Sequence, residues 1–221
     1  MKAWTSVPFC ALVAVSSVAR AEVPLHVDVS TGVLFRRSPD TGTAALFGGD
    51  RVGLALRGAV WFNHAHARLG AWLGYRYEPG ETTGMFGGRV RSWQVAHDLD
   101  LGLVGQYTFG SSPVEKPANC ALFVRSHAGF GLTFSTLQLQ SLDDGNLYSH
   151  ASVGLNGTLS ASVGLRFWGV LEAFVEGGYL SSDIEQLELK QDEVEFGSSQ
   201  RVKIAVPRDG LFTYGGVGLE F

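Results

Sequence analysis

Apolar and polar residues alternate with a period of two along most of the chain beyond residue 24. Successive side chains of a β-strand point to opposite faces of the sheet, so this period predicts strands. The pattern recurs in eight segments, which are 25–36, 52–62, 67–77, 93–109, 122–134, 153–167, 171–179 and 211–221. Beyond residue 21 no stretch holds the roughly 18 apolar residues that a transmembrane helix needs. The pattern predicts an all-β, up-and-down meander.

The connections between these segments differ in length. Tight turns are expected at Asn63-His64 and near Trp168-Gly169, a longer turn at 110–119, and long loops at 37–51, 79–92, 139–150 and 182–210. Proline cannot donate a ladder hydrogen bond, so all prolines beyond residue 21 are expected outside strand interiors. They are Pro24, Pro39, Pro79, Pro113, Pro117 and Pro207.

Alternation alone does not say which face of the sheet is outside, because a soluble eight-stranded barrel would bury its apolar face. The lysines beyond residue 21 (Lys116, Lys190 and Lys203) lie in predicted turns or loops, and the polar strand positions hold mainly small residues. A surface facing water would be richer in Lys and Glu. Aromatic residues of the apolar face also collect at the strand ends, as in the girdles of a lipid-facing barrel. They are Phe35, Tyr75, Tyr77, Trp93, Phe134 and Tyr179 at one end and Phe62, Tyr107, Phe109, Phe167 and Phe221 at the other.

Residues 1–21 carry the features of a secretory signal peptide. Lys2 precedes the apolar run 7–15, and Ala19-Arg20-Ala21 supplies a small-x-small cleavage site. Cleavage there would leave residues 22–221 with Cys120 as the one cysteine, so no intramolecular disulfide is expected. Of the 221 residues 17% are charged, below the roughly 25% of an average soluble protein. The net charge of −4 gives no reason to expect nucleic acid as a partner.

The chain ends in a strand with the motif Tyr214-x-Gly216-x-x-Leu219-x-Phe221. This ending resembles the C-terminal signal by which outer-membrane barrels are recognised for insertion. With the alternating segments and the signal peptide, it resembles the small outer-membrane β-barrel class of OmpA-, OmpX- and OmpW-like proteins. The resemblance implies a monomeric eight-stranded antiparallel transmembrane β-barrel in the outer membrane of a Gram-negative bacterium. It also implies lipid and lipopolysaccharide as surroundings, and the barrel-assembly machinery as a partner during insertion.

Charged residues occupy many of the positions expected to face the lumen. Arg166 and Glu172 are symmetric about the turn near Gly169, so they should face each other on neighbouring strands. Because eight strands enclose a space just wide enough for side chains, the five arginines and six acids should pair. We expect a plugged lumen, and the alternative is a gated or very narrow ion path. The lumen residues are Asp28, Arg57, Arg68, Arg76, Asp98, Asp100, Arg125, Arg166, Glu172, Glu176 and Glu220.

The connection 182–210 also carries alternating residues. Gly197-Ser198-Ser199 is a plausible hairpin turn, and a hairpin centred on Ser198 would place Glu195 opposite Arg201 and Glu193 opposite Lys203. Strands seven and eight are therefore expected to extend as a protruding extracellular hairpin. An exposed hairpin edge can recruit another chain by strand addition, and the alternative is an ordered loop without a dedicated partner.

Two short histidine motifs are candidate chemical sites. His150-x-Ser152 resembles the His-x-Ser pair of the lipid A deacylase PagL, but no acid follows within the matching stretch, since Arg166 is the next charged residue. His64-x-His66 could supply two metal ligands, but a third is missing nearby. His97 breaks the alternation at a lipid-facing position. No catalytic residue, metal or cofactor is expected.

The sequence therefore predicts a non-enzymatic outer-membrane barrel with a structural or surface-interaction role carried by extracellular loops. An extracellular protein is a possible partner. The competing function is a narrow channel for ions or small hydrophobic solutes, and the third is a lipid A-modifying enzyme.

Overall fold

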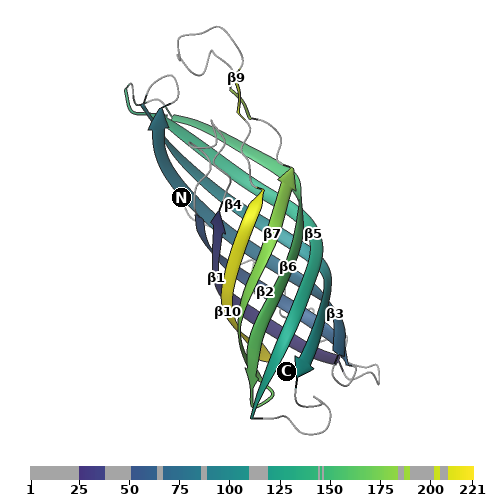
Figure 1. The fold of residues 1–221 in the computed structure, drawn as a ribbon. Helices are drawn as coiled ribbons and strands as arrows, with labels where there is room; N and C mark the ends of the chain where they lie inside the picture. The colour runs from purple at the N-terminus through teal and green to yellow at the C-terminus, as the bar shows by residue number, and fades with distance from the viewer. Residues whose placement is uncertain are drawn as a thin grey trace.

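A computed structural model describes residues 25–37, 51–63, 67–85, 89–109, 119–143, 145, 147–183, 187–189, 202–204 and 209–221. Eight of its strands form one closed antiparallel barrel, in the spatial order β1-β10-β7-β6-β5-β4-β3-β2 (Figure 1). The signal peptide expected at 1–21 and the His64-x-His66 motif lie outside the described residues. No helix in the described part of the chain is long and apolar enough to cross a membrane.

The predicted eight-stranded, up-and-down barrel is confirmed. Its strands are β1 (Leu25–Arg37), β2 (Arg51–Asn63), β3 (Ala67–Met85), β4 (Arg89–Phe109), β5 (Cys120–Ser141), β6 (Leu147–Phe167), β7 (Leu171–Asp183) and β10 (Gly210–Glu220). β1 closes the ring, because it pairs with β2 on one side and with β10 on the other.

The two ends of the barrel differ. The β6–β7 turn, the start of β1 and the end of β10 lie together, since Asp28 is opposite Glu220 and Leu219 is opposite Leu171. We call this the turn end. The β3–β4 and β5–β6 hairpins lie at the other end, which we call the hairpin end (Figure 1).

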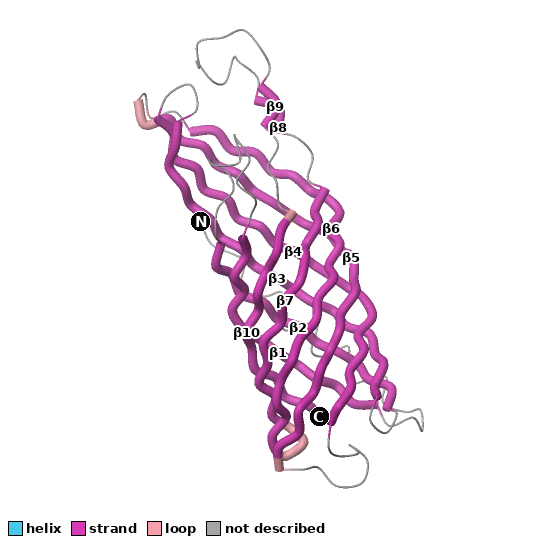
Figure 2. Tube along the Cα trace, viewed as in Figure 1, coloured by secondary structure: helices cyan, strands magenta, loops and turns pink. Residues whose placement is uncertain are grey.

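Four strands are much longer than a membrane requires, and the loops predicted at 79–92 and 139–150 are wrong in large part. β3 to β6 contain 19 to 22 residues each, whereas about 9–11 residues suffice to span a bilayer. β3 and β4 remain paired as far as Met85 and Arg89. Beyond the last pairs with β2 and β7, these strands continue as a four-stranded sheet at the hairpin end (Figure 2). We call residues 78–85, 89–96, 135–141 and 147–154 the projecting sheet.

The polarity of the two faces inverts along β5, which explains why the prediction ended too early. Up to Phe134 the outward positions are largely apolar, but the next outward positions are Thr136 and Gln138, both exposed. The inward positions Leu137 and Leu139 are buried, at 4% and 3% exposure. A search for apolar outward residues therefore stops at the point where the strand leaves the apolar band.

Pro79 lies inside β3, so the prediction that every proline falls outside the strands is also wrong. It is opposite Val95 of β4. On the other side of β3 the described pairing with β2 ends at Tyr77, opposite Leu54. Pro79 thus lies beyond the last described β2–β3 pair, and proline is found in sheets at such edge positions.

The register predicted for the protruding hairpin between the last two barrel strands is wrong. β8 (Leu187–Leu189) and β9 (Val202–Ile204) form a separate two-stranded sheet, with Lys203 opposite Glu188 and not Glu193. The observed register places Leu187 opposite Ile204, whereas a hairpin centred on Ser198 would place Asp192 there. Glu193, Glu195 and Arg201 lie outside the described residues.

The outer wall of the barrel is apolar. Leu69, Leu103 and Leu159 are 71%, 73% and 66% exposed there. His97 is half-exposed on the same wall, in an uninterrupted register, and its Nδ1 lies 2.7 Å from the Tyr75 hydroxyl. The partner explains how a polar ring is tolerated on this face, because its ring nitrogen is satisfied without water.

Inside the barrel, large side chains pack against glycines. Phe123 and Phe174 are buried in the lumen, and a Cβ atom placed on Gly164 would lie 2.4 Å from the Phe123 ring and 2.6 Å from the Ala173 carbonyl oxygen. Glycine is required at this position because neither the ring nor the backbone of the next strand leaves room for a methyl group.

Gly164→Val is therefore expected to lower the free energy of unfolding by about 1–3 kcal/mol, through overpacking. The measurement is urea unfolding of the refolded protein in lipid vesicles. Gly157→Val in the same strand is the control, because nothing lies within 4 Å of a Cβ atom there. Equal stability of the two variants would contradict the packing argument.

Candidate functional site

The lumen contains a balanced set of buried charges. Among the described residues, seven arginines and seven carboxylates are buried. They are Arg36, Arg51, Arg57, Arg68, Arg76, Arg125 and Arg166, with Asp28, Glu78, Asp98, Asp100, Glu172, Glu176 and Glu220. Equal numbers matter because an uncompensated buried charge is strongly destabilising.

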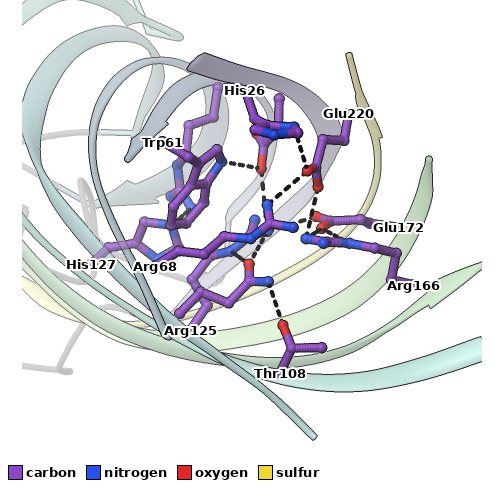
Figure 3. A network of polar contacts seen from close by, with 12 residues as sticks. His26, Trp61, Arg68, Thr108, Arg125, His127, Arg166, Glu172 and Glu220 are labelled. Carbon is purple, nitrogen blue, oxygen red and sulfur yellow. Dashed lines mark hydrogen bonds and ion pairs between the residues drawn. The ribbon is translucent and has the colours of Figure 1, made fainter. Parts of the chain in front are cut away.

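Six of these residues form one cluster near the turn end, which we call the turn-end cluster (Figure 3). It consists of Asp28, Arg68, Arg125, Arg166, Glu172 and Glu220, three positive and three negative groups. Arg166 lies directly opposite Glu172, as the symmetry of the turn predicts, and its Nε donates to Glu172 Oε1 at 3.0 Å.

Two arginines of the cluster each join strands that are not neighbours. Arg125 Nη2 on β5 lies 2.7 Å from Glu172 Oε2 on β7 and 3.2 Å from Asp28 Oδ2 on β1. Arg68 Nη1 on β3 donates to Glu220 Oε1 on β10 at 2.8 Å. The cluster therefore bridges the lumen from wall to wall, as Figure 3 shows.

A second cluster lies around Arg57. Its two terminal nitrogens donate to the two oxygens of Glu176, at 2.7 and 3.1 Å. The same carboxylate accepts from the Ser160 hydroxyl at 2.7 Å. His127 is also buried here, with Nε2 3.2 Å from Arg57 Nη1. The bidentate arrangement fixes Arg57 across the barrel, from β2 to β7.

The third cluster is formed around Arg76. Its Nη2 lies 2.8 Å from Asp100 Oδ2, and its Nε lies 3.4 Å from Asp98 Oδ2. Asp98 also accepts from the Thr133 hydroxyl at 2.6 Å. Towards the hairpin end, Arg36 Nε lies 3.0 Å from Glu78 Oε2.

Aromatic rings fill the space between the guanidinium groups. Arg57 lies 4.8 Å from the centre of the Trp72 ring and 5.5 Å from that of Tyr214. Arg125 lies 5.0 Å from Trp61 and 4.8 Å from Phe123. These contacts are both packing and cation–π interactions.

All eleven charged residues that the sequence assigned to the lumen are buried in it. The sequence missed Arg36, Arg51 and Glu78, which complete the balance of seven and seven. Arg51 is the first residue of β2, although a loop was expected at 37–51, and it contacts Gln94. It also missed the inward aromatic side chains, although their place in the two-residue alternation could have revealed them. Trp61, Trp72 and Phe123 are each under 5% exposed.

The other predicted site residues are not brought together as one site. His150 and Ser152 lie in β6, half-buried on the inward side of the alternation, opposite Leu137 and Ser135. In the C-terminal motif Leu219 and Phe221 face outward, Gly216 is half-buried, and Tyr214 is in the lumen at 1% exposure. No group of three or more His, Cys, Asp or Glu side chains suited to a metal ion occurs among the described residues.

The projecting sheet has two edges of different character. On β3 the edge 78–85 contains Pro79, Gly80, Glu81 and Gly84. On β6 the edge 147–154 contains no proline and no acidic or basic residue other than His150. Its described pairing with β7 begins only at Leu155, opposite Asp183, while Leu147 and Val153 are 59% and 54% exposed.

Solved structures with this fold include outer-membrane proteins. Ail, the attachment invasion locus protein of Yersinia pestis, aligns with a TM-score of 0.51 at 13% identity in its complex with the heparin analogue sucrose octasulfate, covering 89% of this chain and 99% of that chain. A second Ail structure aligns with the same TM-score at 12% identity, covering 89% and 98%. Neisserial surface protein A aligns with a TM-score of 0.36 at 12% identity, covering 89% and 97%. No protein-family model and no curated protein sequence matches the chain.

The chain has the fold of the small eight-stranded outer-membrane β-barrels. Its closed ring leaves no unpaired strand within the barrel, and its exposed outer wall is apolar, as a bilayer requires. The fold and the apolar outer wall are those of a membrane-spanning β-barrel.

The turn-end cluster yields a stability prediction. Glu172→Gln leaves Arg125 and Arg166 short of a buried negative charge and is expected to cost about 3–5 kcal/mol of unfolding free energy. Urea unfolding in vesicles, followed by tryptophan fluorescence, measures it.

The matched control is Glu81→Gln, which removes a half-exposed partner of Arg91 on the projecting sheet. An exposed pair contributes about 0–1 kcal/mol, so this variant should behave almost as the parent. A loss of similar size in both variants would refute the role assigned to burial.

Proposed function

We propose that this protein is a surface-interaction protein of the outer membrane, with a filled lumen and with its working surface on the projecting sheet. The hairpin end faces the outside of the cell, because barrels of this class have short periplasmic turns and longer extracellular connections. Residues 1–21 serve as the export signal, and the C-terminal strand is recognised by the assembly machinery. The single observation that carries the surface role is the uncovered β6 edge in the described structure.

The wall-to-wall contacts support the filled lumen. Arg125 reaches from β5 to β7 and β1, while Arg57 joins β2 to β7 between two aromatic rings. Ions crossing the lumen would have to displace paired charges and tightly packed rings. An eight-stranded barrel offers little spare width for that.

Planar-bilayer recordings of the folded protein are therefore expected to show no single-channel steps. Folding is checked first by the different gel migration of boiled and unboiled samples. Reproducible steps whose size changes in Arg57→Gln would support the alternative function, a narrow channel, and would overturn the filled lumen.

The β6 edge is suited to strand addition by an extracellular protein. An exposed edge presents free N–H and C=O groups to an incoming extended segment, and the alternating outward residues Leu147, Ala151 and Val153 can contact its side chains. The β3 edge is a poor acceptor, since proline, glycine and charge are the features that protect edges from pairing. The name of Ail, attachment invasion locus protein, is in keeping with a surface role for this fold.

A pair of lysine variants tests the edge. Ala151→Lys on β6 should abolish retention of cells carrying the protein on protein-coated surfaces, because a charge on the edge opposes strand pairing. Thr83→Lys on the β3 edge should leave retention unchanged. Surfaces coated with a sulfated polysaccharide are run in parallel. Retention that survives Ala151→Lys, or that occurs on the polysaccharide alone, would show that strand addition is not the mode of binding.

A further inference from the structure

The backbone groups at the open edge of β6 can be assigned residue by residue. The Trp168 N–H, just beyond β6, donates to the Asn119 carbonyl oxygen beside β5 at 3.1 Å. From there β5 and β6 pair in one uninterrupted register as far as Leu147. Backbone groups alternate between the two sides of a strand. The even-numbered residues of β6 therefore direct their N–H and C=O groups to β5, and the odd-numbered residues direct theirs to the opposite side.

Four odd-numbered residues form the open part of this edge. Leu147, Ser149, Ala151 and Val153 precede Leu155, where the described pairing with β7 begins. Their side chains point outward and are exposed, Leu147 at 59% and Val153 at 54%. None of the four is charged, so two identical edges can approach each other without repulsion between their outward side chains.

This row of side chains is complementary to itself. Two copies of the edge that pair antiparallel about His150 place Leu147 opposite Val153 of the other copy, and Ser149 opposite Ala151. Large apolar side chains then meet each other, small ones meet each other, and every odd-numbered residue is in a hydrogen-bonded pair. A shift by two residues in either direction would place Leu147 or Val153 opposite a residue outside the open edge. A second copy of this chain therefore uses the whole edge.

The symmetry of the pair decides where the second copy lies. Identical antiparallel strands are related by a two-fold axis perpendicular to their common sheet. The projecting sheet continues the barrel wall (Figure 2), so this axis runs parallel to the membrane and the second barrel points the opposite way. Within one membrane the two-fold axis would run along the membrane normal, and strands tilted by roughly 35–45° would cross steeply without pairing. The two copies must therefore lie in two facing membranes.

We propose that the partner of the β6 edge is a second copy of this protein on a facing cell, and that the two edges join into one continuous sheet. The inference rests on the proposed surface role of the hairpin end and names the partner of that same edge. His150 lies on the two-fold axis, opposite its own copy. The β3 edge takes no part, since Pro79 and Glu81 oppose strand pairing there.

A charge exchange tests the register on living cells. Cells that carry the parent protein should clump and settle several-fold faster than cells without it. Ser149→Glu or Ala151→Lys should abolish clumping, because each variant places two like charges on diagonal positions of the pair. A mixture of the two populations should clump again, because the new carboxylate is then opposite the new ammonium group. Clumping of either variant alone, or no recovery in the mixture, would overturn the proposal. Thr83→Lys on the β3 edge is the control and should clump like the parent.

Cysteine cross-linking tests the two-fold axis. In a Cys120→Ser background, which removes the exposed native thiol, His150→Cys places each new thiol opposite its own copy. Opposite Cα atoms in an antiparallel pair are about 4.5–5.5 Å apart, within the range of a disulfide. Cells with tagged protein and cells with untagged protein are mixed and oxidised by dissolved oxygen with a copper catalyst. A tagged–untagged dimer is expected on a non-reducing gel, and none from Thr83→Cys in the same background. The absence of mixed dimers from His150→Cys would refute pairing between cells.

Failure of this proposal is distinguishable from failure of the surface role. If the edge binds a different extracellular protein, Ala151→Lys still abolishes retention on protein-coated surfaces, but parent cells do not clump and His150→Cys gives no mixed dimer. That result would refute the second copy as the partner and leave strand addition in place. Retention and clumping that both survive Ala151→Lys would refute both.

Discussion

The structure depends on pairing the charges that are buried inside the barrel. Seven arginines face seven carboxylates among the described buried residues, and several pairs join strands on opposite sides of the ring. A guanidinium group suits this role because it is planar, permanently charged and able to stack on rings while donating from its edges. Glycine complements the rings, as at Gly164 beneath Phe123. Glycines, aromatic rings and paired charges therefore together fill the narrow interior of the barrel.

The fold could be predicted because membrane and water impose opposite demands on alternate residues of each strand. That signal predicts eight strands and their outward faces. The same two-residue alternation assigns eleven charged residues to the lumen. It failed where the surroundings change. Beyond Phe134 the outward residues of β5 become polar and the inward ones apolar, so the projecting sheet was taken for loops. The prediction treats every strand as lipid-facing along its whole length, but β3 to β6 are longer than a bilayer is thick.

The same assumption explains the gaps in the predicted site. Arg51 lies in the loop predicted at 37–51 and Glu78 borders the one predicted at 79–92, so the alternation did not assign them to the lumen. Trp61 and Trp72 were missed for another reason. Apolar residues were assigned to the lipid-facing side, although the positions of these two in the alternation point inward. The register of β8 and β9 could not be found from a turn motif alone. Gly197-Ser198-Ser199 suggests one pairing, whereas the observed sheet pairs Leu187 with Ile204 and Leu189 with Val202, a register that no turn residue marks.

The two ends of the barrel differ in how their strands are stabilised. The turn end is a closed, cross-linked ring, and the hairpin end is a sheet with exposed edges. Near the turn end, ion pairs cross-link the barrel wall, the exterior is apolar, and the closed ring has no unpaired strand edge. At the hairpin end, β3 to β6 leave the ring, and a sheet that leaves a closed ring must acquire edges. Proline, glycine and glutamate protect the β3 edge, while the β6 edge has neither proline nor a carboxylate. If neither edge of the sheet bound a partner, both edges would be expected to carry such protecting residues. This one-sided protection supports the proposal that the β6 edge binds a partner.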